Sequence, residues 1–370
     1  MPLRDLAFAP LSVAYGAAGG ARRALYRAGV LRVERVGAPV LSVGNITAGG
    51  TGKTPLVAWL AREAARAGRR VCILTRGYGR ADEGKRVVVS DGERVLAEAR
   101  EGGDEPRLLA ESLRGLAAVV SDADRVAAAR WAIENLRSDV FILDDGFQHL
   151  RIARDLNILT LDATDPWGGG QLLPRGRLRE PIKELKRADL IVITRAELFG
   201  GDIEDLRERA ASLSQDRPVL IARTVTLRIA PLLTQTVGAP RGTHETHDIP
   251  QSFPADITQL LTAGIPQPFA AFCAIGNPQA FFSHARRAGL ALNYTRSFAD
   301  HHIYTQGDVD EMLRAAARQG ARSLLTTTKD AVKLRALKFT ALPCYVLEVA
   351  LKFDDEERMR AILGEAIARR

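Results

Sequence analysis

Short apolar runs alternate with amphipathic stretches of helical length from Val40 onward. Strands buried on both faces of a parallel sheet are continuous apolar runs, and the intervening stretches carry apolar residues at helical spacing. This order is typical of an α/β fold with a mostly parallel sheet and helices on both faces. We predict strands at 40–43, 71–75, 117–121, 140–143, 158–162, 190–194 and 219–222.

Two local patterns add detail to this series. The first helix is predicted at 55–67, because its apolar residues recur every three or four positions and Pro55 is tolerated in a first turn. Residues 87–89 and 94–96 flank an Asp91-Gly92 turn, a combination that predicts a hairpin inserted into the α/β series.

The alternation stops between about 228 and 268, where Pro, Gly, Thr and His are frequent, and resumes at Phe269 with expected strands at 270–274 and 324–327. No internal repeat of fixed period is visible. We therefore predict four parts: an N-terminal helical segment (1–37), an α/β core (38–228), a linker (229–268) and a smaller C-terminal α/β domain (269–370).

The N-terminal segment is apolar and locally basic. The run 6–18 would extend only about 20 Å as a helix, whereas the hydrocarbon core of a bilayer is about 30 Å thick. Between Met1 and Gly37 there are six arginines and two acidic residues. A secretory signal is disfavoured because a nucleotide motif follows. Two interpretations remain open: an amphipathic helix packed on the protein, or one lying in a membrane interface.

Composition narrows the class of protein. The 370 residues are 46% hydrophobic and 26% charged, which excludes disordered, collagen-like and multi-span membrane classes. The formal net charge of +8 favours an anionic partner, such as nucleic acid, an acidic membrane or a phosphorylated substrate. Three widely separated cysteines form neither a disulfide framework nor a zinc-binding pattern.

The strongest motif is a glycine-rich loop, VGNITAGGTGKTP, between a predicted strand and a predicted helix. In the pattern G-x-x-x-x-G-K-[ST], backbone amides surround phosphate oxygens, the lysine reaches the β- and γ-phosphates, and the hydroxyl binds Mg²⁺. Lys53 and Thr54 occupy these positions, while Thr47 replaces the first glycine. We expect ATP to contact Thr47, Ala48, Gly49, Gly50, Thr51, Gly52, Lys53 and Thr54.

A second motif places acidic residues at the end of an apolar run. Asp144 and Asp145 follow VFIL, as expected of the carboxylate that supports Mg²⁺ beside a phosphate loop. Paired acids at a strand end also cap helices, but two motifs in the right order favour the nucleotide interpretation. The pattern does not decide which of the two carboxylates touches the metal.

These motifs leave the phosphoryl acceptor open. A GTPase would need an N-K-x-D motif, which the sequence lacks, and no nucleic-acid motif of a motor or helicase stands out. A small-molecule kinase needs a base near the acceptor hydroxyl. Asp104 in GGDEP and the FADHH stretch with His301 offer one. From the residues alone, however, Asp104 fits a helix cap better, and His301 fits a polar turn.

The chain closely resembles the tetraacyldisaccharide 4'-kinase family along most of its length. The resemblance rests on eight segments in order: VGNITAGGTGKTP, TRGYGR, GDEP, LDDGFQH, LLPRGRLREP, GNP, FADHH and TKDAVKL. It implies a P-loop kinase that transfers the γ-phosphate of ATP to the 4'-hydroxyl of tetraacyldisaccharide 1-phosphate and forms lipid IVA. It also implies Mg²⁺ and a monomer bound peripherally to the cytoplasmic face of the inner membrane, with no nucleic-acid partner.

The resemblance also assigns roles to individual residues. Asp104 and His301 would act together at the acceptor hydroxyl, and Lys53 would stabilise the transferring phosphate. The implied Mg²⁺ ligands are Thr54 and Asp145, with Asp144 next to them and Glu180 as a further ligand. Candidate contacts to the sugar or its phosphate are Asn45, Tyr78, Arg80 and Arg177.

Overall fold

The computed structural model describes residues 3–232 and 263–368, which form two compact units. Unit 1 comprises 1–223 and 351–370, and unit 2 comprises 224–350. Most of the predicted linker lies outside the described residues. The boundaries between the units fall within two strands, β8 (Val219–Pro231) and β12 (Cys344–Phe353).

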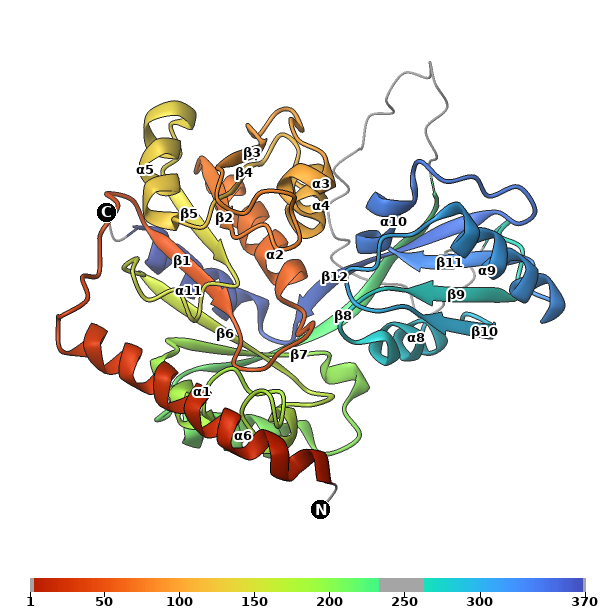
Figure 1. Cartoon of the computed structure of the whole chain (residues 1–370). Helices are drawn as coiled ribbons and strands as arrows, with labels where there is room; N and C mark the ends of the chain where they lie inside the picture. Colours follow the sequence, from red (N-terminus) through yellow and green to blue (C-terminus); the bar gives the residue numbers. More distant parts are fainter. Residues whose placement is uncertain (1–2, 233–262, 369–370) are drawn as a thin grey trace. The chain divides into compact units, whose positions relative to one another are not determined.

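Unit 1 is built on a sheet in the order β8-β7-β6-β1-β5-β2-β4-β3 (Figure 1). All neighbouring pairs from β8 to β4 are parallel, and the edge strand β3 is antiparallel to β4. The remaining strands of unit 1 are β1 (Val40–Gly44), β2 (Val71–Thr75), β3 (Val87–Ser90), β4 (Ala117–Ser121), β5 (Val140–Asp144), β6 (Leu156–Asp162) and β7 (Leu190–Thr194).

Helices connect these strands. The α-helices of unit 1 are α1 (Leu3–Arg27), α2 (Lys53–Arg66), α3 (Ala99–Gly102), α4 (Asp104–Ser112), α5 (Arg125–Leu136), α6 (Ile203–Leu213) and α11 (Glu356–Ala368). Three short 3-10 helices are η1 (Gly168–Gly170), η2 (Ile182–Arg187) and η3 (Ala196–Leu198). The predicted first helix is thus confirmed, beginning two residues earlier than expected.

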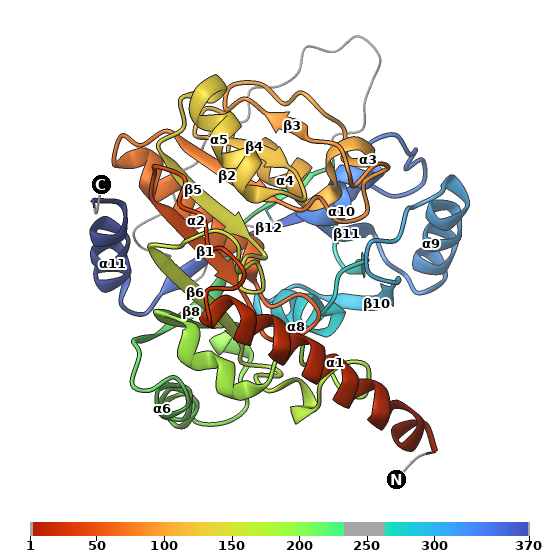
Figure 2. The ribbon, with the colours of Figure 1, turned by 60° about the vertical axis from the view of Figure 1, so that its left-hand side comes forward.

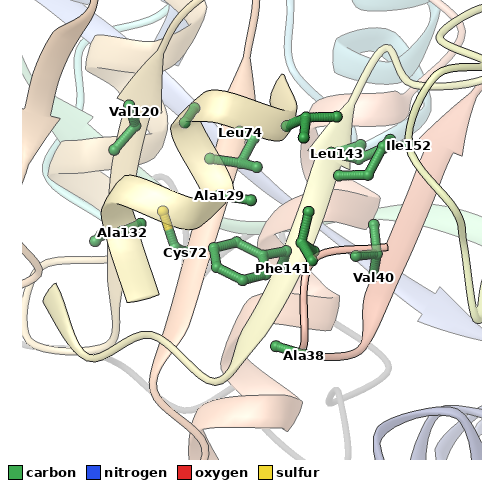
Figure 3. Close-up of a cluster of buried hydrophobic side chains, with 14 residues drawn as sticks. Ala38, Val40, Cys72, Leu74, Val120, Ala129, Ala132, Phe141, Leu143 and Ile152 are labelled. Atoms are coloured by element: carbon green, nitrogen blue, oxygen red, sulfur yellow. The ribbon is translucent and has the colours of Figure 1, made fainter. Parts of the chain in front are cut away.

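Alternate residues of the central strands enter two different layers. Cys72, Leu74 and Phe141 point toward α5, where Ala129 and Ala132 cover them (Figure 3). The intervening residues face the other side of the sheet, and α2 packs against β1, β2 and β5. The predicted α/β fold with helices on both faces is therefore confirmed, and the parallel strands bring several loops to one sheet edge.

Unit 2 contains a smaller sheet in the order β10-β9-β11-β12-β8. Its β9, β10 and β11 are mutually parallel neighbours, with β9 in the centre. The elements of unit 2 are β9 (Phe269–Cys273), α8 (Pro278–Arg287), β10 (Leu292–Ser297), α9 (Gln306–Arg318), β11 (Ser323–Thr327) and α10 (Thr328–Leu334).

Three features differ from the sequence pattern. The second arm of the expected hairpin, 94–96, forms only a bridge between Val95 and Ser90, and β3 pairs with β4 instead. Strand β8 continues to Pro231, through the expected start of the linker. The last twenty residues return to unit 1, because α11 buries Met359 and Leu363 and contacts α2.

The N-terminal segment forms one helix, α1, of 25 residues. Within the described part of the chain, no helix combines the length and the apolarity needed to span a bilayer. One side of α1 is buried at Ser12 and Arg23, while Leu11 and Val13 are 56% and 72% exposed. The packed interpretation therefore holds for one face only, and the exposed face carries the apolar residues.

Candidate phosphate-binding and phosphoryl-transfer site

The glycine-rich loop leaves β1 and ends where α2 begins, at Lys53. Gly49 and Gly52 have φ values of 107° and 76°, a region that favours glycine. A Cβ atom at Gly52 would also lie 3.2 Å from the Thr194 Cβ. The glycines thus let the backbone turn tightly and direct the first amides of α2 toward the loop, the arrangement that binds phosphate.

Lys53 connects the loop to the end of β5. Its Nζ donates a hydrogen bond to Asn45 Oδ1 at 3.2 Å and lies 3.4 Å from Asp145 Oδ1. Asn45 is fully buried and its amide nitrogen donates to the Thr47 carbonyl at 2.7 Å. The predicted substrate residue Asn45 therefore orients the loop and its lysine.

Asp145 is held in its ionised form. Burial opposes ionisation, but Lys53 and Arg179 outweigh it and lower the pKa of Asp145 to about 2. The Arg179 guanidinium donates to Asp145 Oδ2 at 2.7 Å, and Oδ1 faces Lys53 Nζ at 3.4 Å. An ionised carboxylate is the kind of ligand that Mg²⁺ prefers.

The neighbouring Asp144 has the opposite character. It is 3% exposed, and its burial together with the charges of Glu105 and Asp145 raises the pKa of Asp144 to about 7. Two adjacent carboxyl groups therefore differ strongly in proton affinity, and Asp145 is the one that forms ion pairs with Lys53 and Arg179.

Residues at the carboxyl ends of β6 and β7 also hold the phosphate loop in place. Arg195 donates to the Gly50 carbonyl at 2.7 Å and pairs with Asp162. The hydroxyl of Thr194 donates to the Thr51 carbonyl at 2.9 Å, and the Thr51 hydroxyl lies 2.9 Å from that of Thr160. The sequence analysis did not identify these partners. Polar residues near the carboxyl ends of β6 and β7 were the pattern that could have indicated them.

A segment containing residues 171–180 runs along the loop. Thr47 and Leu178 form an antiparallel bridge, and the Ala48 amide donates to the Arg177 carbonyl at 2.6 Å. The Arg177 guanidinium donates to the Ala48 carbonyl at 2.9 Å and contacts Asp165 at 2.8 Å. Arg177 thus lies beside the phosphate loop and holds its backbone, and its contact with a sugar or phosphate stays a prediction.

Glu180 lies at the end of this segment and is buried between two arginines. It pairs with Arg187, and its Oε2 lies 3.7 Å from Arg23 Nη1. Burial raises the pKa of Glu180, although both arginines oppose that shift. Among the described residues, no group of three or more His, Cys, Asp and Glu side chains is arranged to hold a metal ion. Mg²⁺ in phosphate-loop proteins takes further ligands from the nucleotide and water.

The TRGYGR segment contributes two different side chains. Arg80 is 5% exposed and donates to the carbonyls of Lys85 and Ser121 at 2.7 and 2.9 Å. Tyr78 is 63% exposed, with the Arg76 guanidinium over its ring. Arg80 therefore organises this segment, and Tyr78 remains available to a ligand.

The two predicted acceptor-side residues lie in different units. Asp104 is the first residue of α4 in unit 1, after the cap residue Gly103, and accepts a hydrogen bond from the Glu105 amide at 2.9 Å. His301 lies in unit 2, before α9, with φ at 61° and its amide donating to Asp300 at 3.1 Å. The helix-cap alternative for Asp104 is not what the structure has, because Gly103 occupies that position.

The second histidine of FADHH has a structural environment. The ring of His302 stacks on Phe298 with 4.8 Å between centroids, and its Nε2 lies 3.2 Å from Asp308 Oδ2. His301 is half-buried, and its Nε2 lies 3.8 Å from Asp300 Oδ2. Each of the two imidazoles therefore lies near a carboxylate of unit 2.

Comparisons with known proteins agree with one another. Residues 4–368 match the family described as Tetraacyldisaccharide-1-P 4'-kinase. The chain is 44% identical over 334 residues to the tetraacyldisaccharide 4'-kinase of Geobacter metallireducens, covering 88% of this chain and 87% of that one. The Geobacter sulfurreducens protein of the same name is 39% identical, with 95% and 91% covered.

A solved structure is similar along the whole chain. The "apo" form of LpxK from Aquifex aeolicus, in complex with ATP, superposes with a TM-score of 0.72 and 29% sequence identity, covering 99% of this chain and 100% of that one.

Proposed function

The chain belongs to the tetraacyldisaccharide-1-P 4'-kinase family, and we propose that it transfers the γ-phosphate of ATP to the 4'-hydroxyl of tetraacyldisaccharide 1-phosphate. The main support for this proposal is the contact between the two motifs. Lys53, at the start of α2, forms an ion pair with Asp145, the residue after β5. Family membership confirms the predicted kinase activity, and the donor side of unit 1 supplies the groups that such a reaction needs.

The loop residues fit a nucleoside triphosphate with Mg²⁺. Gly49, Gly50 and Gly52 add no side chains to the loop, and the ionised Asp145 carboxylate is suited to a cation. Thr54 and Asp145 would hold Mg²⁺, and the further candidate ligands are Asp144, next to Asp145 in the sequence, and Glu180. When bound, the ion supplies positive charge to the phosphate oxygens. The Aquifex aeolicus relative with ATP supports the choice of nucleotide.

Lys53 and Arg179 are two cations that this chain itself would contribute near the phosphates. A phosphoryl group passes through a loose transition state, so positioning and charge neutralisation provide most of the catalysis. Asn45 keeps Lys53 oriented, and Arg179 keeps Asp145 ionised. Both functions depend on side chains that are already in place in unit 1.

On the acceptor side, Asp104 would take the proton of the sugar hydroxyl, and His301 would assist it. Family likeness motivates this pairing, and the half-buried position of each side chain in its own unit is compatible with it. Tyr78 is a further candidate for a sugar contact because its ring is exposed.

The exposed face of α1 would associate with the lipid surface that holds the substrate, at the cytoplasmic face of the inner membrane. Phe8, Leu11, Val13 and Tyr15 are all at least 40% exposed, and arginines follow in the same helix. We expect Leu11→Gln with Val13→Gln to weaken binding to vesicles containing anionic lipid. Leu96→Gln is the control, since Leu96 is 51% exposed elsewhere on unit 1. Undiminished binding would place the anchor on another surface.

The reaction is tested with purified protein, γ-labelled ATP and tetraacyldisaccharide 1-phosphate in detergent micelles. We expect label in the lipid with ATP and Mg²⁺, none with a nucleic-acid acceptor, and much less with GTP. Lys53→Met should reduce the transfer by about 10²–10³-fold, whereas Lys186→Met, at an exposed position of η2, should preserve it. Absence of labelled lipid with folded wild-type protein would refute the proposal. Size-exclusion chromatography in the same detergent tests the expected monomer.

A further inference from the structure

The helix α1 packs on unit 1 through its small and polar residues. Ser12 donates to the Leu172 carbonyl at 3.1 Å and accepts from the Arg175 amide at 3.1 Å. Gly16 approaches so closely that an added Cβ would lie 2.7 Å from Leu172 Cδ1. Figures 1 and 2 both show α1 (red) running along the yellow-green part of unit 1. The contact is therefore close, and the segment that starts at about 171 forms the unit 1 side of it.

The same face of α1 ends in a buried cluster of charges. Arg23 is 9% exposed, with its Nε 3.3 Å from Glu184 Oε1 and its Nη1 3.7 Å from Glu180 Oε2. Arg187 contacts both glutamates as well, at 3.1 Å to Glu184. Two arginines thus balance two buried glutamates, and removing one arginine would leave buried negative charge without compensation.

The segment that α1 contacts is the one that runs along the phosphate loop. The Arg179 amide donates to the Ile46 carbonyl at 2.6 Å, and the Arg179 side chain binds Asp145. Its neighbour Glu180 is the partner of Arg23. A continuous series of contacts therefore leads from α1 through residues 172–187 to the loop and to the carboxylate beside Lys53.

We propose that α1 is a structural part of the nucleotide site, and that Arg23 is a positioning residue that fixes residues 172–187 against the phosphate loop. The helix then has two roles on two faces, one exposed and apolar and the other engaged with the loop's supporting segment. This inference deepens the proposed function, because identifying the ligand as ATP rests on that function. The contacts that support the inference all lie within this chain.

The first test uses Arg23→Gln in the full chain, with Arg27→Gln as the matched control, because Arg27 is exposed in the last turn of the same helix. The probe is a fluorescent, non-hydrolysable ATP analogue. We expect Arg23→Gln to raise its Kd about fivefold or more, the lower range of typical coupling between sites. Arg27→Gln should bind normally and Arg23→Lys should recover part of the affinity. The kcat at saturating ATP should change less than the KM for ATP.

The second readout is hydrogen exchange in protein without nucleotide. Arg23→Gln should accelerate exchange of the amides in 45–52 and 172–180, while the amides of β4 and α5 remain as protected as in the wild type. A general loss of stability would instead accelerate exchange across unit 1. Normal Kd together with normal exchange in folded Arg23→Gln would overturn the proposal.

If Arg23→Gln does not fold, a third variant tests the packing of α1 without changing any charge. Gly16→Val should separate α1 from Leu172 and produce the same local changes, whereas Ala17→Val, at an exposed position of the same helix, should not. Equal behaviour of the two valine variants would also overturn the proposal. Failure of the wild type to bind the ATP analogue would refute the proposed function instead, and exchange in 45–52 would still decide whether Arg23 positions the loop.

Discussion

The donor and acceptor sides of the proposed reaction are built differently. The donor side lies wholly in unit 1, where Lys53, Asp145 and Arg179 contact one another and the phosphate loop is bonded to strands on either side. The acceptor-side candidates are divided, with Asp104 in unit 1 and His301 in unit 2. Donor-side substitutions should therefore alter nucleotide binding, whereas acceptor-side substitutions should leave nucleotide binding unchanged.

The largest expected effect is on the acceptor side. Asp104→Asn and His301→Ala should each reduce kcat by about 10²–10⁴-fold, the usual contribution of general-base catalysis, with unchanged affinity for ATP. The double variant should lose little more than either single variant if the two residues act together. Steady-state kinetics and nucleotide titration measure both quantities, with Asp205→Asn on the exposed side of α6 as control. Wild-type kcat in both single variants would eliminate the pair.

A donor-side change should affect binding and turnover together. Lys53→Met removes the cation that meets Asp145, and we expect kcat to fall by about 10²–10³-fold, as when a preorganised electrostatic contact is lost. The KM for ATP should rise as well, because Lys53 also holds Asn45 in the loop. A variant with normal ATP affinity and normal kcat would contradict the assignment of this loop.

The two adjacent aspartates should have opposite effects on stability. The folded-state pKa of Asp145 is lowered, so its charge stabilises the fold above its unfolded pKa of about 4, and this contribution is lost only as pH falls toward about 2. The folded-state pKa of Asp144 is raised to about 7, so its ionisation opposes folding at higher pH, and this penalty fades as pH falls from about 7 toward 4.

Thermal unfolding of the two variants between pH 8 and pH 5 measures this contrast. At pH 8, Asp144→Asn should raise the melting temperature and Asp145→Asn should lower it, each by about 2–4 °C per kcal/mol of changed stability. Toward pH 5 the gain for Asp144→Asn should shrink, while the loss for Asp145→Asn should stay constant. Parallel pH profiles for the two variants would contradict the different roles assigned to these carboxyl groups.

The smallest expected effect is at Tyr78. An exposed aromatic ring contributes about 0.5–1 kcal/mol to a contact, so Tyr78→Ala should raise the KM for the lipid acceptor only a few-fold. The KM for ATP should not change, since the phosphate loop lies on other elements. An unchanged KM for the acceptor would remove Tyr78 from the substrate site.

Much of unit 1 was predictable because its signals are local. The strands 71–75, 117–121 and 190–194 have the predicted bounds, since strands buried on both faces are continuous apolar runs. The phosphate loop was predictable because glycine, lysine and threonine occur at fixed spacing. Strand β10 was missed because its residues are only partly buried and carry no apolar run.

Other features depend on partners distant in the sequence. Nothing near Glu356 indicates that α11 returns to pack on α2, and nothing near Arg23 indicates that it meets Glu180 and Glu184. The partly exposed, apolar side of α1 also reverses the usual expectation that apolar residues face the protein. Charge pairing and helix docking of this kind are decided by the folded chain and not by a local pattern.

The position of the phosphate in the product tests the central claim most directly. Wild-type protein is incubated with ATP, Mg²⁺ and tetraacyldisaccharide 1-phosphate, and the lipid product is analysed by ³¹P NMR and mass spectrometry. We expect one added phosphomonoester, at the 4'-hydroxyl, and far less of it with Lys53→Met and with Asp104→Asn. A phosphate added at another hydroxyl, a diphosphate at the 1-position, or undiminished product with both variants would contradict this expectation.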